Sequence, residues 1–119
     1  MTSAASRLRV LEHKGIVSIE FIDRNILDEA NIKQIGEEIS QIIDSQVQPK
    51  MLISFANVDH LSSSALGTLI TINNRITSKD GQLRLADIDE QIHQIFVITK
   101  LNKLFHIHET SEQAMQSFT

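Results

Sequence analysis

Short apolar runs alternate with segments of helical periodicity along this chain, which limits it to few folds. Residues 51–56 (MLISFA) form the clearest run, which is short and β-rich enough to be a buried strand. Three consecutive serines follow, and apolar residues then recur three and four positions apart, which predicts an amphipathic helix. Repeated strand–helix order with short links predicts one α/β domain with a mostly parallel sheet and right-handed crossovers.

The N-terminal part adds a hairpin to this pattern. Residues 7–12 and 16–22 are predicted to be strands, and His13-Lys14-Gly15 supplies the turn between them. Apolar and polar residues alternate in the second strand, so we expect one face of the sheet to be partly open to water and helices to cover the other. Residues 7–119 are assigned to the domain and residues 1–6 to a disordered leader.

About four helices are expected. The first begins between Leu27 and Asn31; the second follows the serines and stops at Ser78-Lys79-Asp80-Gly81, where Gly81 suits a left-handed cap. A strand at 82–86, a third helix, a strand at 104–108 and a last helix complete the chain. The apolar stripes of the four helices are Ile32, Ile35, Ile39 and Ile42; Ala65, Leu69, Ile72 and Ile76; Ile88, Ile92, Ile95, Phe96 and Leu101; and Ala114, Met115 and Phe118.

Composition narrows the function classes. The chain has 119 residues and 41% hydrophobic content, which suits one domain with an ordinary core. A net charge of -4 provides no basic stripe for a nucleic-acid backbone, so direct nucleic-acid binding is not expected. The absence of cysteine excludes disulfides and thiolate metal sites. No run approaches the roughly 20 apolar residues of a membrane span, and we expect a cytoplasmic protein without a cofactor.

The serines occupy the predicted start of the second helix. Helix starts leave backbone N–H groups without partners, and a Ser cap is worth roughly 1 kcal/mol, so Ser62 or Ser63 could be a cap and nothing more. The same place carries the positive end of the helix dipole, which would hold a phosphate added to a Ser hydroxyl. The residues thus leave a structural and a regulatory interpretation open.

A strand, then Leu61-Ser62-Ser63-Ser64-Ala65-Leu66-Gly67, then an amphipathic helix resembles the signature turn of STAS domains, the family of bacterial anti-sigma-factor antagonists. In that family the turn reads apolar-Asp-Ser-(Ser/Thr)-Gly-Leu-Gly, and the first Ser after the Asp is phosphorylated. On this chain that acceptor position falls on Ser63. Ser62 stands in place of the family Asp, and Ala65 in place of the first Gly.

The resemblance implies a binding protein that is not an enzyme. The unmodified domain would bind an anti-sigma factor that is itself a Ser kinase, so that the sigma factor is released, and a Ser phosphatase would restore the modified form. Asn25 and Ile26 follow the first long strand, whose carboxyl end should lie near the same edge, and they are weaker candidates. The expected partner contacts around Ser63 are Leu61, Ser62, Ser64, Leu66, Asn25 and Ile26.

A scaffold module that assembles with other proteins and is never phosphorylated is the alternative from another class. Ser62 and Ala65, which depart from the family turn, keep it open. No Gly-rich phosphate loop or Gly-x-Ser-x-Gly elbow supports catalysis.

Two less favoured alternatives concern other side chains. A degenerate receiver domain would be phosphorylated on Asp59, but it needs an acidic pair where only Asp23 stands, and a late Lys that Lys100 or Lys103 supplies at an unsuitable place. A metal could use two histidines of the strand at 104–108. A third ligand is not identified, so no metal is predicted. The histidines considered are His106, His108, His93 and His60.

Overall fold

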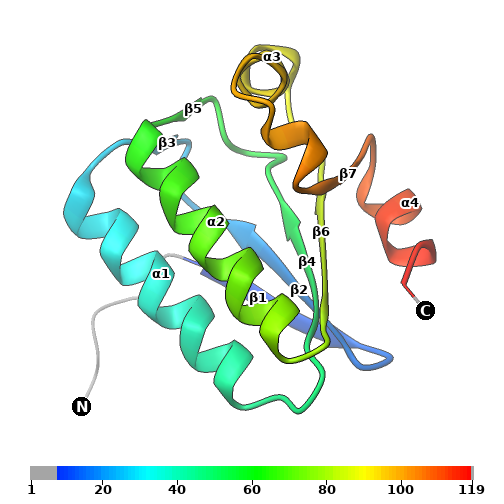
Figure 1. Cartoon of the computed structure of the whole chain (residues 1–119). Coiled ribbons are helices and arrows are strands. Elements are labelled where there is room, and N and C mark those ends of the chain that lie inside the picture. Colours follow the sequence, from blue (N-terminus) through cyan, green and yellow to red (C-terminus); the bar gives the residue numbers. More distant parts are fainter. Residues whose placement is uncertain (1–7, 119) are drawn as a thin grey trace.

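A five-stranded sheet forms the centre of the structure, a computed structural model that describes residues 8–118 (Figure 1). The strand order is β1-β2-β4-β6-β7. β1 and β2 are antiparallel and all other neighbours are parallel, which confirms the mostly parallel α/β architecture. The expected leader, residues 1–6, lies outside the described residues. The strands are β1 (Leu8–His13), β2 (Ile16–Phe21), β4 (Lys50–Ser54), β6 (Gln82–Ala86) and β7 (His106–His108).

The predicted hairpin is present, and its turn has the expected chemistry. Lys14 and Gly15 both take positive φ angles, 55° and 79°. Two central residues with positive φ are typical of the tight hairpin turn whose twist matches that of the flanking strands. The pairing then brings Val10 opposite Ile19 and Leu8 opposite Phe21.

Helices α1 (Glu29–Asp44) and α2 (Ser63–Ser78) lie side by side on one face of the sheet (Figure 1). The predicted stripe of α2 is buried as expected. In α1 the last core residue is Ile43, not the predicted Ile42, which is only partly buried. An α-helix has 3.6 residues per turn, so the residue that follows Ile39 on the same face can lie three or four positions later. Ile39 and Ile43 are both fully enclosed against the sheet.

The third predicted helix is shorter than its apolar pattern suggested. Helix α3 spans Glu90–Ile98, and Lys100 with φ of 63° ends it, because a left-handed residue cannot continue a right-handed helix. Leu101 therefore belongs to a separate 3-10 helix, Leu101–Lys103, and the next strand begins only at His106. Ile92 and Phe96 are buried as predicted, whereas Ile95 faces solvent in part.

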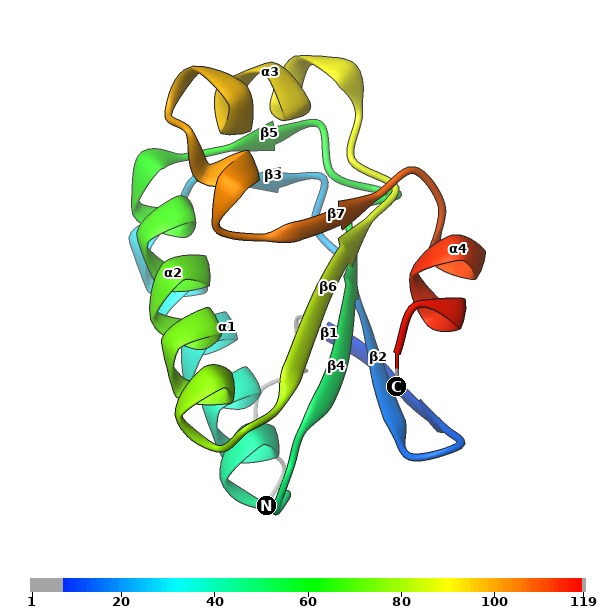
Figure 2. The same ribbon diagram turned by 45° about the vertical axis from the view of Figure 1, so that its right-hand side comes forward.

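Helix α4 (Ser111–Gln116) lies on the opposite face of the sheet from α1 and α2 (Figures 1 and 2). Ala114 is buried there in a second apolar cluster with Leu52 and Ala86, and Met115 and Phe118 pack against it. The face expected to be open to water is thus covered over β4 and β6. It stays open over the hairpin, where an exposed ion pair joins Arg9 and Glu20.

One carboxylate connects α4 to the sheet. Asp87 takes a left-handed φ of 61° directly after β6. Its oxygen Oδ2 accepts hydrogen bonds from the hydroxyls of Ser54, at 2.7 Å, and of Ser111, and its Oδ1 accepts from the Ser111 backbone N–H at 3.2 Å. Ser54 is buried at the carboxyl end of β4, so this bond satisfies a hydroxyl that would otherwise be costly to bury.

The glycine after α2 has a different role from the predicted one. The left-handed residue is Asp80, with φ of 58°, and Gly81 is not among the residues with positive φ. A Cβ at Gly81 would lie 2.3 Å from the carbonyl oxygen of Pro49 and 2.9 Å from Cγ2 of Ile76. Glycine is therefore required at position 81 by the close approach of the chain segments that enter β4 and β6, and not by the helix cap.

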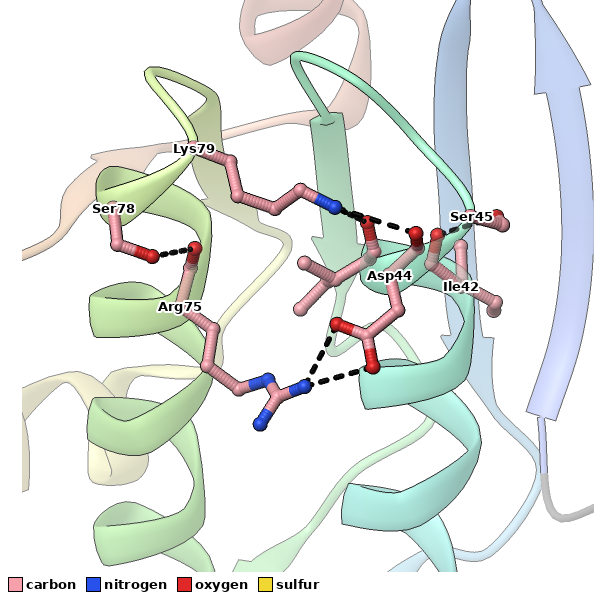
Figure 3. A network of polar contacts seen from close by, with 7 residues as sticks. Ile42, Asp44, Ser45, Arg75, Ser78 and Lys79 are labelled. Carbon is pink, nitrogen blue, oxygen red and sulfur yellow. Dashed lines mark hydrogen bonds and ion pairs between the residues drawn. The ribbon is translucent and has the colours of Figure 1, made fainter.

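Polar contacts hold the C-terminal ends of α1 and α2 together (Figure 3). A guanidinium nitrogen of Arg75 donates to both carboxylate oxygens of Asp44, at 2.7 and 2.9 Å. The Lys79 ammonium donates to the carbonyl oxygens of Ile43, at 2.9 Å, and of Asp44, at 3.3 Å. A cation at these last carbonyls complements the negative end of the α1 dipole.

The first prediction compares two glycines of the α2 region. We expect Gly81→Ala to lower the free energy of unfolding by about 2 kcal/mol or more, because the new methyl group meets a backbone carbonyl that cannot move away cheaply. Gly67→Ala is the matched control. A Cβ there meets nothing within 4 Å, so we expect it to stabilise the helix by about 0.5–1 kcal/mol. Urea denaturation measures both, and similar values for the two variants would contradict the packing argument.

The second prediction concerns the pH dependence of stability. Burial, followed by the charges of Arg84 and His106, lowers the pKa of His108 below its ordinary value. The unfolded chain therefore binds the proton more readily than the folded one, so this residue contributes stability that is complete above its unfolded pKa and is lost as the pH falls below it. We expect His108→Gln to lose less stability than wild type between about pH 7 and pH 5. The free energy of unfolding of the two proteins is measured by urea denaturation at each pH. If the two curves of free energy against pH run parallel, His108 is not a source of this pH dependence.

Candidate functional site

The three serines, Ser62 to Ser64, form what we call the serine turn. They were predicted to follow the central strand directly, but a short ribbon of paired chain lies between that strand and the turn. Residues 55–62 intervene between β4 and α2, and two of them form β5 (His60–Leu61). This strand pairs in parallel with β3 (Asn25–Ile26), which leads into α1. The ribbon lies beside the N-terminal ends of α1 and α2 (Figures 1 and 2). The starts of the two helices are thus tied together.

Backbone hydrogen bonds extend this ribbon in both directions. The N–H of Ser62 donates to the Ile26 carbonyl at 3.1 Å, and the N–H of Asp59 donates to the Arg24 carbonyl at 2.7 Å. The Arg24 and Asp59 side chains form an exposed ion pair at 2.9 Å. Exposed pairs contribute little stability, so the backbone bonds and the buried Ile26 side chain fix the position of the turn.

Ser62 is the N-cap of α2. Its backbone is extended, with φ of −81° and ψ of 166°, and its hydroxyl oxygen accepts a hydrogen bond from the Ala65 N–H at 3.2 Å. Its carbonyl accepts the first helical bond, from the Leu66 N–H. The cap anticipated from the serine triplet therefore exists, and Ser62 provides it.

Ser63 and Ser64 are the first two residues of α2, and both are exposed. The first turn of α2 contains no acidic side chain, so the positive end of its dipole is not offset by a carboxylate of its own. By contrast, α1 has an Asp28 cap and Glu29 in its first turn. The N-terminal end of α2 can therefore accept added negative charge.

The other residues predicted for partner contact differ in exposure. Asn25 is exposed, and Leu61 is half-buried. Ile26 and Leu66 are buried in the main core, so their side chains support the turn from beneath. All of them nevertheless meet at one end of the molecule, because β3 and β5 are paired in register.

A shallow groove of about 340 Å³ adjoins the turn and was not predicted. It lies between the ribbon and α3, and its lining includes Leu27 and Asp59 together with β5 and one side of α3. We call it the α3 groove. No periodicity in the sequence marks it, because it forms where three segments distant along the chain meet. Its other lining residues are His60, Leu61, Gln91, Ile92 and Ile95.

The alternative sites find no support in the part of the chain that the structure describes. Among residues 8–118, no group of three or more His, Asp or Glu side chains is arranged to hold a metal ion. His93 and His108 line one depression, whereas His60 lines the α3 groove. Asp59, the receiver candidate, is paired with Arg24. No helix within these residues has the length and apolar content needed to cross a membrane.

Comparison with known proteins agrees with this architecture. Residues 8–114 match the STAS domain family. The anti-sigma F factor antagonist of Paenibacillus polymyxa is 18% identical over 109 residues, which cover 92% of each chain. An anti-sigma-factor antagonist (STAS) domain protein from Planctomyces limnophilus superposes with a TM-score of 0.84 at 19% identity, over 92% of this chain and 96% of that one.

A further similar structure is SpoIIAA, a Bacillus cell fate determinant, in its phosphorylated form. It has a TM-score of 0.69 and 19% identity, over 92% of this chain and 96% of that one. The family match covers nearly all described residues, and the sheet order and helix placement agree with it. This chain therefore belongs to the STAS domain family, whose anti-sigma factor antagonists are regulatory binding proteins and not enzymes.

Proposed function

We propose that this protein is an anti-sigma-factor antagonist switched by phosphorylation of Ser63. In its unmodified form it binds an anti-sigma factor with Ser kinase activity, and the sigma factor is released. The kinase then phosphorylates Ser63, and a Ser phosphatase restores the binding form. One observation carries this proposal: the Ser63 side chain is exposed in the first turn of α2 while Ser62 alone caps the helix.

The division of roles between the two serines makes a switch physically feasible. Modifying Ser63 leaves the bond from the Ala65 N–H to the Ser62 hydroxyl in place. A phosphate brings about −1.5 to −2 charges at pH 7, and the helix N-terminus stabilises them. We therefore expect little change inside the domain and a large change at its surface. The names of the relatives, anti-sigma factor antagonists, support the role of antagonist.

The proposed contact surface combines the turn with the ribbon. Asn25, Leu61 and the three serines present uncharged groups to a partner, and the buried Ile26 and Leu66 keep them in place. Docking removes water from this surface. A phosphate held there would lose its hydration, which costs far more than burying a neutral hydroxyl. Phosphorylation therefore lowers affinity without unfolding the domain.

The third prediction tests the acceptor. The purified anti-sigma factor kinase of the same organism is incubated with ATP and each of wild type, Ser63→Ala and Ser64→Ala, and incorporation is located by mass spectrometry. We expect Ser63→Ala to abolish phosphorylation and Ser64→Ala to retain it. We also expect Ser63→Asp to weaken binding by about tenfold or more. Full phosphorylation of Ser63→Ala would transfer the role to another residue. If Ser63→Asp binds as wild type does and wild type is not phosphorylated, the unphosphorylated scaffold is favoured.

The fourth prediction separates the cap from the switch by stability. Ser62→Ala should lower the free energy of unfolding by about 1 kcal/mol, because it removes the acceptor of the Ala65 N–H. Ser63→Ala should change it by less than about 0.5 kcal/mol, as for an exposed position with no cap bond. Thermal and urea unfolding of both variants provide the comparison. A larger loss in Ser63→Ala than in Ser62→Ala would show that the roles are reversed.

A further inference from the structure

The α3 groove lies next to the serine turn. Leu61 lines it and directly precedes the Ser62 cap, and Leu27 lines it and directly precedes the Asp28 cap of α1. Ile95 of α3 is part of the same lining. Figure 2 shows α3 running along β5 at this end of the molecule. A protein that contacts Ser63 can therefore reach the groove without leaving this surface.

The lining of the groove is almost free of net charge. Leucine and isoleucine side chains and the amide of Gln91 make up most of it. Asp59 is the one acid that lines it and His60 the one base, and the 2.9 Å ion pair with Arg24 offsets the charge of Asp59. Such a lining, in which leucine and isoleucine predominate, favours an uncharged, aliphatic occupant, since a charged group buried there would lose its hydration.

Large aliphatic side chains are exposed around this groove. Leu27 is 53% exposed and Ile95 is 36% exposed. Ile98 follows Ile95 by three positions, so it lies on the same side of α3 one turn further along, and it is 78% exposed. A helix that places two isoleucines outward on one side, next to a leucine from another segment, has apolar area that binding would remove from water.

We propose that the α3 groove receives an aliphatic side chain of the anti-sigma factor kinase and is the anchor of that complex. This inference rests on the proposed function and deepens it. The anchor and the switch are separate: the groove supplies affinity by apolar burial, and Ser63 determines whether the adjoining turn is neutral or negative. Losing the anchor weakens binding of the unmodified protein, whereas the chemistry at Ser63 is preserved once the complex has formed.

The fifth prediction uses variants on both walls of the groove and a matched control. Ile95→Ser and Leu27→Ser come from different elements and each remove an exposed aliphatic group. Val97→Ser is the control, because Val97 is 47% exposed on the same helix but does not line the groove. Dissociation constants for the purified anti-sigma factor kinase of the same organism are measured by calorimetry, and phosphorylation rates are measured over a range of antagonist concentrations. Thermal unfolding confirms that each variant is folded.

We expect Ile95→Ser and Leu27→Ser each to weaken binding by about fivefold or more and Val97→Ser by less than about twofold. In the kinase assay the two groove variants should raise KM and leave kcat unchanged. Equal effects of Ile95→Ser and Val97→Ser would overturn the anchor. If Ile95→Ser and Leu27→Ser abolish self-association and leave the affinity for the kinase unchanged, the anchor is also overturned. The groove is then assigned to a second copy of this chain.

The two proposals can fail separately. If Ser63 is phosphorylated but the groove variants bind normally, the anchor is wrong and the proposed function stands. If the groove variants lose affinity for the kinase and Ser63 is never phosphorylated, the switch is wrong and the contact surface stands. If the kinase neither binds nor modifies wild type, both fail.

Discussion

The apolar layer between the five-stranded sheet and the α1–α2 pair holds the fold together. Ile39 and Ile43 of α1 and Ile72 and Ile76 of α2 are almost completely enclosed in it. Burying a side chain of this size contributes about 1.5–3 kcal/mol. Because both helices are held along most of their length, their N-terminal ends are fixed relative to the sheet. The serine turn owes its position to this layer together with the backbone bonds of the β3–β5 ribbon.

Stability and candidate function are therefore placed at different parts of the fold. The Asp44–Arg75 pair and the Lys79 cap lie at the C-terminal ends of α1 and α2, whereas Ser63 lies at the N-terminal end of α2 (Figures 1 and 3). Added charge at the turn is thus remote from the contacts that hold the helices together. Asp87 similarly fixes α4 on the other face of the sheet, away from the turn.

Much of the fold follows from periodicity in the sequence, and the misplaced details have local causes. The α2 stripe, the hairpin and the parallel order were predictable because each rests on a pattern repeated over several residues. β3 and β5 were not, because two residues cannot show a period. The need for Gly81 came from a carbonyl more than thirty positions earlier, that of Pro49, which no local rule includes.

The candidate site was predictable to the same extent. The cap was expected at Ser62 or Ser63, and tertiary hydrogen bonding decided for Ser62. The meeting of Asn25 with the serine turn was expected from strand ends, and the pairing of β3 with β5 brings it about. The α3 groove could not be anticipated. The sequence pattern of α3 indicates which residues face the core, but it does not indicate which distant segment lies next to the other side of the helix.

The ribbon of β3 and β5 is held by fewer ladder bonds than the main sheet. Its ladder has two residue pairs, whereas β4 lies between two neighbours in the main sheet. Local opening free energy grows with the number of contacts that must break, so ribbon amides should exchange with solvent hydrogen sooner than those of β4. The serine turn is thus mounted on a part of the fold that opens more readily than the central strand, and a partner can adjust it while the ladder of the main sheet stays intact.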